Sequence, residues 1–332
     1  MAKKKVEEQQ IGNYIISEEP LDFISTGCKL LDCTIGGGFP LRRISNIVGD
    51  KSSNKTGITV EVMANFRKKY PKGKIWYHEA ESAFDLSYAK ELGMPIDENT
   101  FIIEDIETVD GLHKQIYEAI DIINKAEVPG LYILDTLDAI KDNPTTEMSE
   151  GYDAARRAAL INSLVTTLKG DIKRSNMHLM FVSQIRENIG AGLFGDKYRR
   201  SGGKALDFYA SQVIWLAVKD KIKQVYKGQT LVSGIHIKAS VKKNKIGLPF
   251  RTCEFPVLFY YGIHDTLASL EWLKDIKGGL EELNIPAKDI KEYADKIRDT
   301  KDIDTKEKID AMVEKYWNEI NQEFLPKIKK YE

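Results

Sequence analysis

The sequence predicts an α/β protein in which helices cover both faces of a mostly parallel central sheet, followed by a small helical C-terminal domain. Apolar runs of strand length alternate with amphipathic helical patterns between about residues 43 and 184, which is typical of repeated strand–helix units. One run, GLYILD at 130–135, is almost continuously apolar and indicates a strand buried on both faces. From about Asp265 the chain becomes charged and helix-patterned, as in DTKEKIDAMVEKYWNEI.

The elements follow in order from the N-terminus. RISNIVGD at 43–50 is an apolar strand, and a loop connects it to an amphipathic helix at 56–70. Further strands are expected at 74–81, 101–106, 130–135 and 178–184, with helices at 85–93, 109–126 and about 152–173, and with later strands at 212–218, 233–241 and 252–261. No internal repeat is visible. The expected division is therefore a short segment at 1–24, a core domain at 25–264 and the helical domain at 265–332.

Composition narrows the class of protein. The chain has 332 residues, of which 42% are hydrophobic, and this allows one full α/β core with a smaller addition. The formal net charge is -1, so binding to nucleic acid requires a local basic cluster. No stretch reaches the roughly 18 apolar residues of a membrane span, and MAKKKVEEQQ lacks the apolar core of a signal peptide. We expect a cytoplasmic protein without a membrane partner.

The three cysteines do not form a pattern typical of metal sites. Cys28, Cys33 and Cys253 form no C-x-x-C pair and have no histidine at metal-binding spacing. We interpret them as reduced thiols that pack in the core.

The stretch GDKSSNKTG at 49–57 is close to the phosphate-binding pattern G-x-x-x-x-G-K-[ST], with Asn54 in place of the second glycine. Its residues are Gly49, Asp50, Lys51, Ser52, Ser53, Asn54, Lys55, Thr56 and Gly57. A strand precedes it and a helix follows it, so backbone N–H groups can form an anion-binding nest. Lys55 can reach the β and γ phosphates, and the Thr56 hydroxyl can ligate Mg²⁺. The alternative is a polar surface turn.

The departure at Asn54 has a structural consequence. If the position requires a positive φ, asparagine is among the least costly residues other than glycine. The substitution is therefore compatible with a phosphate loop.

Polar residues at the ends of other strands complete a candidate site. Asp135 ends GLYILD, where a carboxylate suits Mg²⁺, because ligands of open α/β sheets gather at the carboxyl ends of strands. Glu79 and Glu81 close the strand after the phosphate loop, and either can orient or deprotonate an attacking water. Gln184 ends HLMFVSQ and can sense a γ phosphate. The alternatives are solvated acidic strand ends and a buried amide at the edge of the sheet.

The segment IRENIGAGLFGDKYRRSGGKALDFYAS at 185–211 is rich in glycine and in cations. Its basic residues include Arg186, Lys197, Arg199, Arg200 and Lys204, its aromatic residues include Phe194 and Tyr198, and its glycines include Gly202 and Gly203. Cations that follow a backbone and a ring that stacks on bases are typical of single-stranded nucleic acid binding. The alternative is a surface loop without a ligand.

Several segments together carry a resemblance to the RecA/RadA family of DNA recombinases, over about residues 24–263. The segments are ISTGCKLLDCTIGGGFPLRRISNIVGDKSSNKTG, EAESAFDLSYAKELGM, LYILDTLDAI, MFVSQIRENIG, SGGKALDFYAS and VKKNKIGLPFRTCEF. They occur in the order of the family, which is far more specific than one phosphate loop. The fold implied is the RecA-like P-loop NTPase core.

The resemblance implies roles for the nucleotide site. Lys55 and Thr56 would hold the phosphates and Mg²⁺, with Asp135 as the second carboxylate near the metal. Glu81, preferred to Glu79, would activate the attacking water. Gln184 would couple the γ phosphate to DNA binding. Asp85 and Tyr88 match the positions that contact and stack on adenine.

The resemblance also implies roles for DNA and for a neighbouring subunit. The loop 185–204 would be the second DNA-binding loop, with Phe194 as the ring inserted between base triplets. A first loop would lie at about 143–157, where Arg156 matches an arginine that faces DNA. Lys243 and Lys245 would reach the ATP of the neighbouring subunit. Without the family, these two lysines indicate a solvated basic turn.

The chain departs from the family at its ends and in its phosphate loop. Asn54 replaces a glycine, and Gly57 stands where a second threonine is common. Only about two dozen residues precede ISTG, so a subunit-contact arm at 1–24 would be short. The chain ends LPKIKKYE, without the acidic tail of many bacterial members.

We therefore expect an ATP- and Mg²⁺-dependent recombinase. It would form a filament by self-association on single-stranded DNA, pair that strand with homologous duplex DNA and exchange strands. One alternative is a weakly hydrolysing paralogue that acts as a mediator or scaffold. Another is a ring-forming, helicase-type ATPase on the same core.

Overall fold

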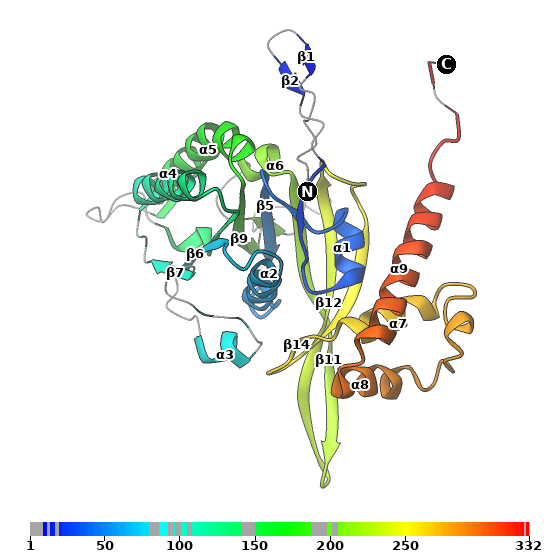
Figure 1. Ribbon diagram of the computed structural model, residues 1–332. Helices are drawn as coiled ribbons and strands as arrows, with labels where there is room; N and C mark the ends of the chain where they lie inside the picture. Colours follow the sequence, from blue (N-terminus) through cyan, green and yellow to red (C-terminus); the bar gives the residue numbers. More distant parts are fainter. Residues whose placement is uncertain are drawn as a thin grey trace.

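The centre of the molecule is a ten-stranded sheet (Figure 1), with strand order β14-β13-β12-β11-β5-β9-β8-β6-β7 and with β10 paired to β9. The computed structural model of the chain describes residues 9–11, 14–16, 20–79, 86–91, 94, 96, 101–104, 106, 108–140, 150–187, 198–200, 205–328 and 330–331. The strands from β11 to β7 run parallel. They are β11 (Gln212–Tyr226), β5 (Ile44–Gly49), β9 (Met177–Glu187), β8 (Gly130–Asp135), β6 (Lys74–Glu79) and β7 (Phe101–Glu104).

An antiparallel part extends the sheet beyond β11. It contains β12 (Gln229–Asn244), β13 (Thr252–Leu258) and β14 (Gly262–Ile263), and β10 (Tyr198–Arg200) runs antiparallel to β9. Two small separate sheets pair β1 (Gln9–Ile11) with β2 (Tyr14–Ile16) and β3 (Phe23–Ile24) with β4 (Phe39–Pro40).

Helices cover both faces of the sheet. Alternate side chains of a strand point to opposite sides, so a strand that is apolar throughout needs a layer of helices on each side. Leu131 and Ile133 of β8 pack in the same cluster as α1 (Lys29–Ile35) and α2 (Lys55–Lys69). Tyr132 and Leu134 pack on the other side, with α4 (Val109–Ala126) and α5 (Glu150–Arg174). The expected fold class, a mostly parallel sheet with helices on both faces and C-terminal helices, is confirmed.

Two elements have the bounds that their sequence pattern predicts. β8 covers GLYILD and all six of its residues are buried. α4 covers 109–126, where Thr108 caps the helix by accepting a hydrogen bond from the N–H of Gly111. The remaining helices are α3 (Leu86–Glu91), α6 (Ala205–Tyr209), η1 (Leu137–Ala139) and η2 (Glu281–Leu283), besides the C-terminal helices.

Strands β11 and β12 are much longer than the expected 212–218 and 233–241. They form a ribbon whose distal half projects from the molecule (Figure 1). Its turn is made by Lys227 and Gly228, both with positive φ, as in the tight hairpin turns that match strand twist. The prediction was too short because Val225, Tyr226 and Leu231 are exposed, so no apolar face marks the distal strands in the sequence.

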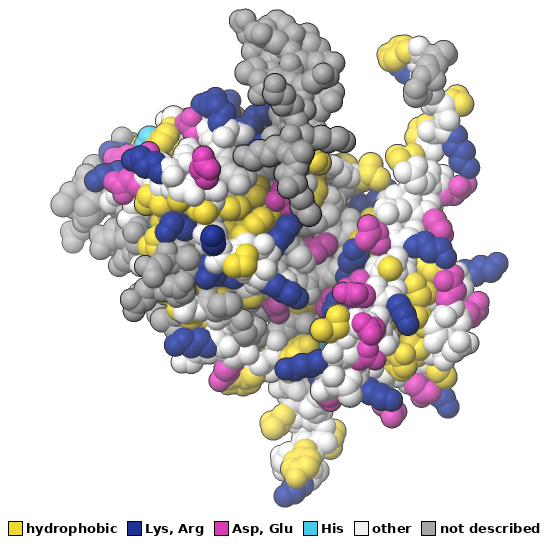
Figure 2. Space-filling view, viewed as in Figure 1, with side chains coloured by type: hydrophobic (Ala, Val, Ile, Leu, Met, Phe, Trp, Pro, Cys, Tyr) yellow, Lys and Arg dark blue, Asp and Glu magenta, His cyan; other side chains and the backbone are white. Residues whose placement is uncertain are grey.

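The C-terminal helices are α7 (Asp265–Lys274), α8 (Ile290–Thr300) and α9 (Ile303–Glu323). Their apolar residues belong to the same core cluster as α1 and β13, and Figure 2 shows acidic and basic side chains interspersed on their outer surface. α7 begins at the expected boundary, Asp265, while the division into domains stays a prediction. Among the described helices, none has a stretch both long and apolar enough to cross a membrane.

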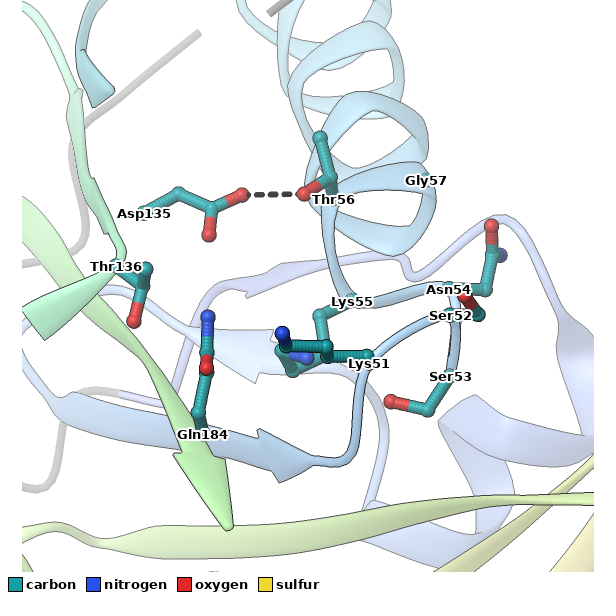
Figure 3. A pocket seen from close by; sticks show the side chains of 10 residues that line it. All are labelled: Lys51, Ser52, Ser53, Asn54, Lys55, Thr56, Gly57, Asp135, Thr136 and Gln184. Carbon is teal, nitrogen blue, oxygen red and sulfur yellow. Dashed lines mark hydrogen bonds between the residues drawn. The ribbon is translucent and has the colours of Figure 1, made fainter. Parts of the chain in front are cut away.

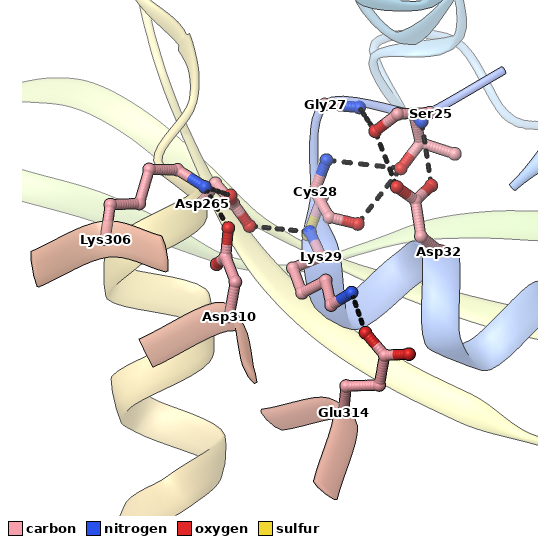
Figure 4. A network of polar contacts seen from close by, with 10 residues as sticks. Ser25, Gly27, Cys28, Lys29, Asp32, Asp265, Lys306, Asp310 and Glu314 are labelled. Carbon is pink, nitrogen blue, oxygen red and sulfur yellow. Dashed lines mark hydrogen bonds and ion pairs between the residues drawn. The ribbon is translucent and has the colours of Figure 1, made fainter. Parts of the chain in front are cut away.

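A polar network joins α1 to α7 and α9 (Figure 4). The backbone N–H of Lys29 donates to Asp265 Oδ1 at 2.7 Å. The ammonium group of Lys306 lies 2.6 Å from both Asp265 Oδ2 and Asp310 Oδ2. Lys29 Nζ lies 2.5 Å from Glu314 Oε2. We call these five residues the junction network; it fastens the C-terminal helices to the core.

Candidate nucleotide-binding site

A pocket of about 430 Å³ lies at the carboxyl ends of the parallel strands. The register of the sheet explains its position: Gly49 at the end of β5 pairs with Gln184 on β9, and β9 separates β5 from β8. The lining residues come from the phosphate loop, from the end of β8 and from β9 (Figure 3). They are Lys51, Ser52, Ser53, Asn54, Lys55, Thr56, Gly57, Asp135, Thr136 and Gln184.

The backbone of the loop folds around the carbonyl group of Asp50. This oxygen accepts hydrogen bonds from the Ser53 hydroxyl at 2.8 Å and from Lys55 Nζ at 2.8 Å. Gly49 is required at the start of the loop, since a Cβ there would lie 2.3 Å from Ser53 Oγ and 2.9 Å from the Leu216 carbonyl oxygen. Asp50 itself binds the following N–H, that of Lys51, through its carboxylate at 2.7 Å.

Asn54 adopts the left-handed conformation, with φ 61° and ψ 29°. The position thus has a positive φ, the condition under which asparagine is among the least costly replacements for glycine. Ser52 also has a positive φ, 61°. The loop therefore turns into α2 without the second glycine of the usual pattern.

The Thr56 hydroxyl and the Asp135 carboxylate meet at the start of α2, where Thr56 Oγ1 donates to Asp135 Oδ2 at 2.7 Å. Asp135 is 6% exposed, and the Tyr77 hydroxyl donates to the same oxygen at 3.0 Å. Hydroxyl and carboxylate oxygens fit Mg²⁺, which binds proteins through few carboxylates and keeps phosphate and water ligands. No group of three or more His, Cys, Asp or Glu suited to a metal occurs within the described part of the chain.

Gln184, three residues before the end of β9, is held by a residue that the sequence did not indicate. Asp138 in η1 accepts from the backbone N–H of Gln184 at 2.6 Å and from the Thr136 hydroxyl at 3.2 Å. Figure 3 shows the side chains of Lys51, Lys55 and Gln184 directed into the same space. The turn after β8 thus fixes the strand that carries Gln184.

Tyr77 and Asp138 left only weak signals in the sequence. Tyr77 lies at an alternate position of KIWYHE, and Asp138 lies three residues after Asp135 in LYILDTLDAI. A strand tyrosine and a turn aspartate have many structural uses, so neither pattern indicates a site without the fold.

Other predicted nucleotide residues are not tested. Glu81 and Asp85 lie outside the described residues, and Tyr88 lies on α3. Glu79, the weaker candidate base, ends β6 in register with Asp135. The water-activating and adenine roles therefore stay predictions.

The predicted second DNA loop extends a hairpin. Strand β9 continues to Glu187, past the expected start of the loop at 185, and β10 returns beside it, with Arg199 opposite Arg186 and Arg200 opposite Ile185. The segment between them therefore begins four residues after Gln184. The predicted DNA-binding residues Phe194, Lys197, Gly202 and Gly203 lie outside the described residues.

Residues 143–149 of the predicted first DNA loop lie outside the described part of the chain, while 150–157 form the start of α5 rather than a loop. Arg156 is exposed on α5. Its contact with DNA stays a prediction.

Lys243 and Lys245 do not line the pocket of their own subunit. Lys243 Nζ donates to the carbonyl groups of Asp207 at 2.5 Å and Phe208 at 2.7 Å, at the end of α6, and Lys245 Nζ lies 3.5 Å from the latter. Burial, together with the charge of Lys245, lowers the pKa of Lys243 to about 8. These lysines bind the last carbonyl groups of a helix, as basic residues often do.

The cysteines agree with their interpretation as packing thiols. Cys28 and Cys253 are buried, Cys33 is half-buried, and all three are free. Burial raises the pKa of Cys33 and of Cys253 to about 12, which keeps both as unreactive thiols.

Comparisons with known proteins agree with the geometry. The family model of the RecA N-terminal domain matches residues 7–264. Protein RecA of Clostridium beijerinckii is 34% identical over 257 residues, covering 76% of this chain and 67% of the relative. Those of Colwellia psychrerythraea (248 residues; 74% and 68%) and Legionella pneumophila strain Corby (257 residues; 76% and 70%) are also 34% identical. This chain therefore belongs to the RecA family.

Proposed function

We propose that this protein is an ATP-dependent DNA recombinase, which assembles on single-stranded DNA and exchanges it with a homologous duplex. The observation that carries the proposal is one pocket edge where a phosphate loop, the Thr56–Asp135 pair and Gln184 meet. Family membership supports it, since the relatives are named RecA.

The pocket suits the phosphates of ATP. Lys51 and Lys55 contribute positive charge to its lining, and the start of α2 offers backbone N–H groups to an anion. Thr56 and Asp135 would hold Mg²⁺, which neutralises charge on the phosphates when it is bound. Asp135 keeps its orientation because Tyr77 donates to it from the neighbouring strand β6.

Hydrolysis requires a base that orients water against the γ phosphate. We assign this role to Glu81, two residues after Glu79, the end of β6 in register with Asp135. Asp85 and Tyr88 would then contact the adenine.

Gln184 is proposed to link nucleotide state to DNA binding. Its side chain lines the pocket, and its backbone is fixed by Asp138. Because the strand continues directly into the hairpin with Arg186, Arg199 and Arg200, a shift at the γ phosphate would change the position of the DNA-binding loop. ATP would then favour the DNA-bound filament, and hydrolysis would favour release.

Lys243 and Lys245 are proposed to complete the site of the neighbouring subunit. They bind the carbonyl end of α6, the helix that follows the DNA-binding segment. A lysine that moves to a neighbour's phosphate must leave these carbonyl groups. Assembly would therefore be coupled to α6, and ATP turnover would depend on a filament.

A strand-exchange experiment tests the proposal. Purified protein is incubated with ATP, Mg²⁺, circular single strands and a homologous linear duplex, and joint molecules are measured while filaments are imaged. We expect joint molecules only with homologous duplex and ATP. Filaments that produce no joint molecules and show no stimulation of ATP turnover by DNA would instead favour the weakly hydrolysing mediator. The substitution at Asn54 is the feature that suggests this alternative. Closed rings would favour the helicase-type alternative.

A further inference from the structure

The two departures in the phosphate loop, Asn54 and Gly57, occupy one space. A Cβ placed on Gly57 would lie 2.2 Å from Asn54 Oδ1 and 2.7 Å from both Asn54 Cγ and Nδ2. Real Cβ atoms do not approach other atoms this closely, so the Asn54 carboxamide fills the place where a side chain at position 57 would begin.

The Asn54 carboxamide does not serve as an ordinary helix cap. Asn54 is the N-cap residue of α2, yet its side chain accepts no capping hydrogen bond, although asparagine is a favoured cap for that purpose. Gly57 in the first turn is equally unusual, because glycine is one of the least favourable residues in a helix. Neither residue is explained by helix formation.

Both residues line the nucleotide pocket. Figure 3 shows Thr56 facing Asp135 on one side of the helix start, with Asn54 on the other side. Since Thr56, Asp135 and Gln184 mark the end where the terminal phosphate would lie, Asn54 marks the end nearer the α phosphate and the sugar. A carboxamide there has two N–H donors and no charge.

We propose that Asn54 and Gly57 are a matched pair, in which the Asn54 carboxamide replaces a side chain at position 57 and donates a hydrogen bond to the α phosphate of the nucleotide. The inference rests on the proposed ATP binding, and it adds a nucleotide-positioning role for Asn54. It also explains why the two departures occur together, because a side chain at position 57 would displace the Asn54 carboxamide, and removal of the carboxamide alone would leave an unfilled space.

The test is a double-mutant cycle with Asn54→Gly, Gly57→Thr and the double variant, measured as Kd for ADP and ATP by calorimetry with Mg²⁺. We expect Gly57→Thr to weaken binding about 10-fold or more and Asn54→Gly only a few-fold, while the double variant stays within about 3-fold of wild type. If the two single effects multiply in the double variant, the matched pair is refuted.

A variant of the same shape distinguishes the hydrogen bond that Asn54 would donate from the packing of its side chain. Asn54→Asp keeps the volume but replaces the N–H donors with a negative charge, so it should weaken ADP and ATP by the same factor, about 10-fold or more. A loss confined to ATP would place Asn54 at the terminal phosphate and overturn the assignment, as would unchanged binding. Thermal melting without nucleotide verifies that each variant folds.

The cycle separates this inference from the proposed function. If wild-type protein does not bind ADP or ATP, the proposed function fails. If it binds both but Asn54 and Gly57 act independently, only the inference fails.

Discussion

In the junction network the positive charges are balanced, because two lysines lie beside three carboxylates. The pocket, in contrast, is lined by two lysines and only one carboxylate. Lys306 is shared by Asp265 and Asp310 within 2.6 Å (Figure 4). In the pocket, Lys51 and Lys55 border an open volume of about 430 Å³. The network therefore holds elements together, while the pocket keeps an excess of positive charge that suits an anion.

The largest effect should come from removing a pocket cation. We expect Lys55→Ala to lower ATP turnover about 100-fold or more, because it removes the charge that we propose binds the phosphates. Its melting temperature without nucleotide should stay close to that of wild type, since the Lys55 ammonium group donates to a carbonyl group of its own loop, that of Asp50. Turnover and thermal melting are measured on the same preparations. Equal loss of stability would remove the distinction between the pocket and the network.

The reverse result is expected in the junction network. Lys306→Met leaves Asp265 and Asp310 facing each other without their shared cation, which should lower the free energy of unfolding by about 2 kcal/mol. ADP binding by the folded protein should not change. Denaturant unfolding measures the loss, and Lys308→Met, an exposed lysine on the same helix, is the control. A loss of similar size in the control would show that the network is not specific.

Within one subunit, Lys243 belongs neither to the pocket lining nor to the junction network. Lys243→Ala should lower ATP turnover in filaments about 10-fold, because it removes the cation that we propose a neighbouring subunit supplies. Nucleotide binding by an isolated subunit should remain nearly intact. Lys242→Ala, which removes a neighbouring lysine that lies over the Trp215 ring, is the matched control. Equal loss of binding and turnover in Lys243→Ala would refute the action in trans.

The smallest effect concerns pH. Burial raises the pKa of Glu61, which accepts from the N–H of Ile263, to about 7. Burial likewise raises the pKa of Asp32 to about 7. A carboxyl with a raised folded pKa stabilises the fold at low pH, and this contribution is lost as pH rises through 7.

We therefore expect wild type to be less stable at pH 8.5 than at pH 5.5. In Glu61→Gln, the loss of unfolding free energy between pH 5.5 and 8.5 should be smaller than in wild type by about 1 kcal/mol. Denaturant unfolding across this pH range measures it. An unchanged slope in Glu61→Gln would show that Glu61 titrates normally.

The sequence predicted those parts whose signal is local. Strand β8 and helix α4 follow directly from an apolar run and from a helical period with a threonine cap. The phosphate loop and Asp135 were predicted together because carboxyl ends of parallel strands meet at one edge. Residue preference indicated only that asparagine at position 54 is compatible with a positive φ, which the structure has.

Other features depend on contacts that no local pattern encodes. The distal β11–β12 ribbon was missed because its exposed Val225 and Leu231 alternate with no buried face. The position of the Asn54 carboxamide, where a Cβ of residue 57 would lie, depends on where α2 starts. The hydrogen bond from the Gln184 N–H to Asp138 joins residues 46 positions apart in the chain. It could be predicted only if the order of the strands in the sheet were known.

The most direct test of the central claim is ATP hydrolysis with and without single-stranded DNA, with wild type beside Glu81→Gln and filaments imaged from the same samples. A working, DNA-coupled pocket predicts several-fold stimulation by DNA in wild type. In Glu81→Gln it predicts loss of turnover with filaments retained. Filaments whose turnover stays at background in wild type would contradict it, because the pocket would then bind ATP without hydrolysing it.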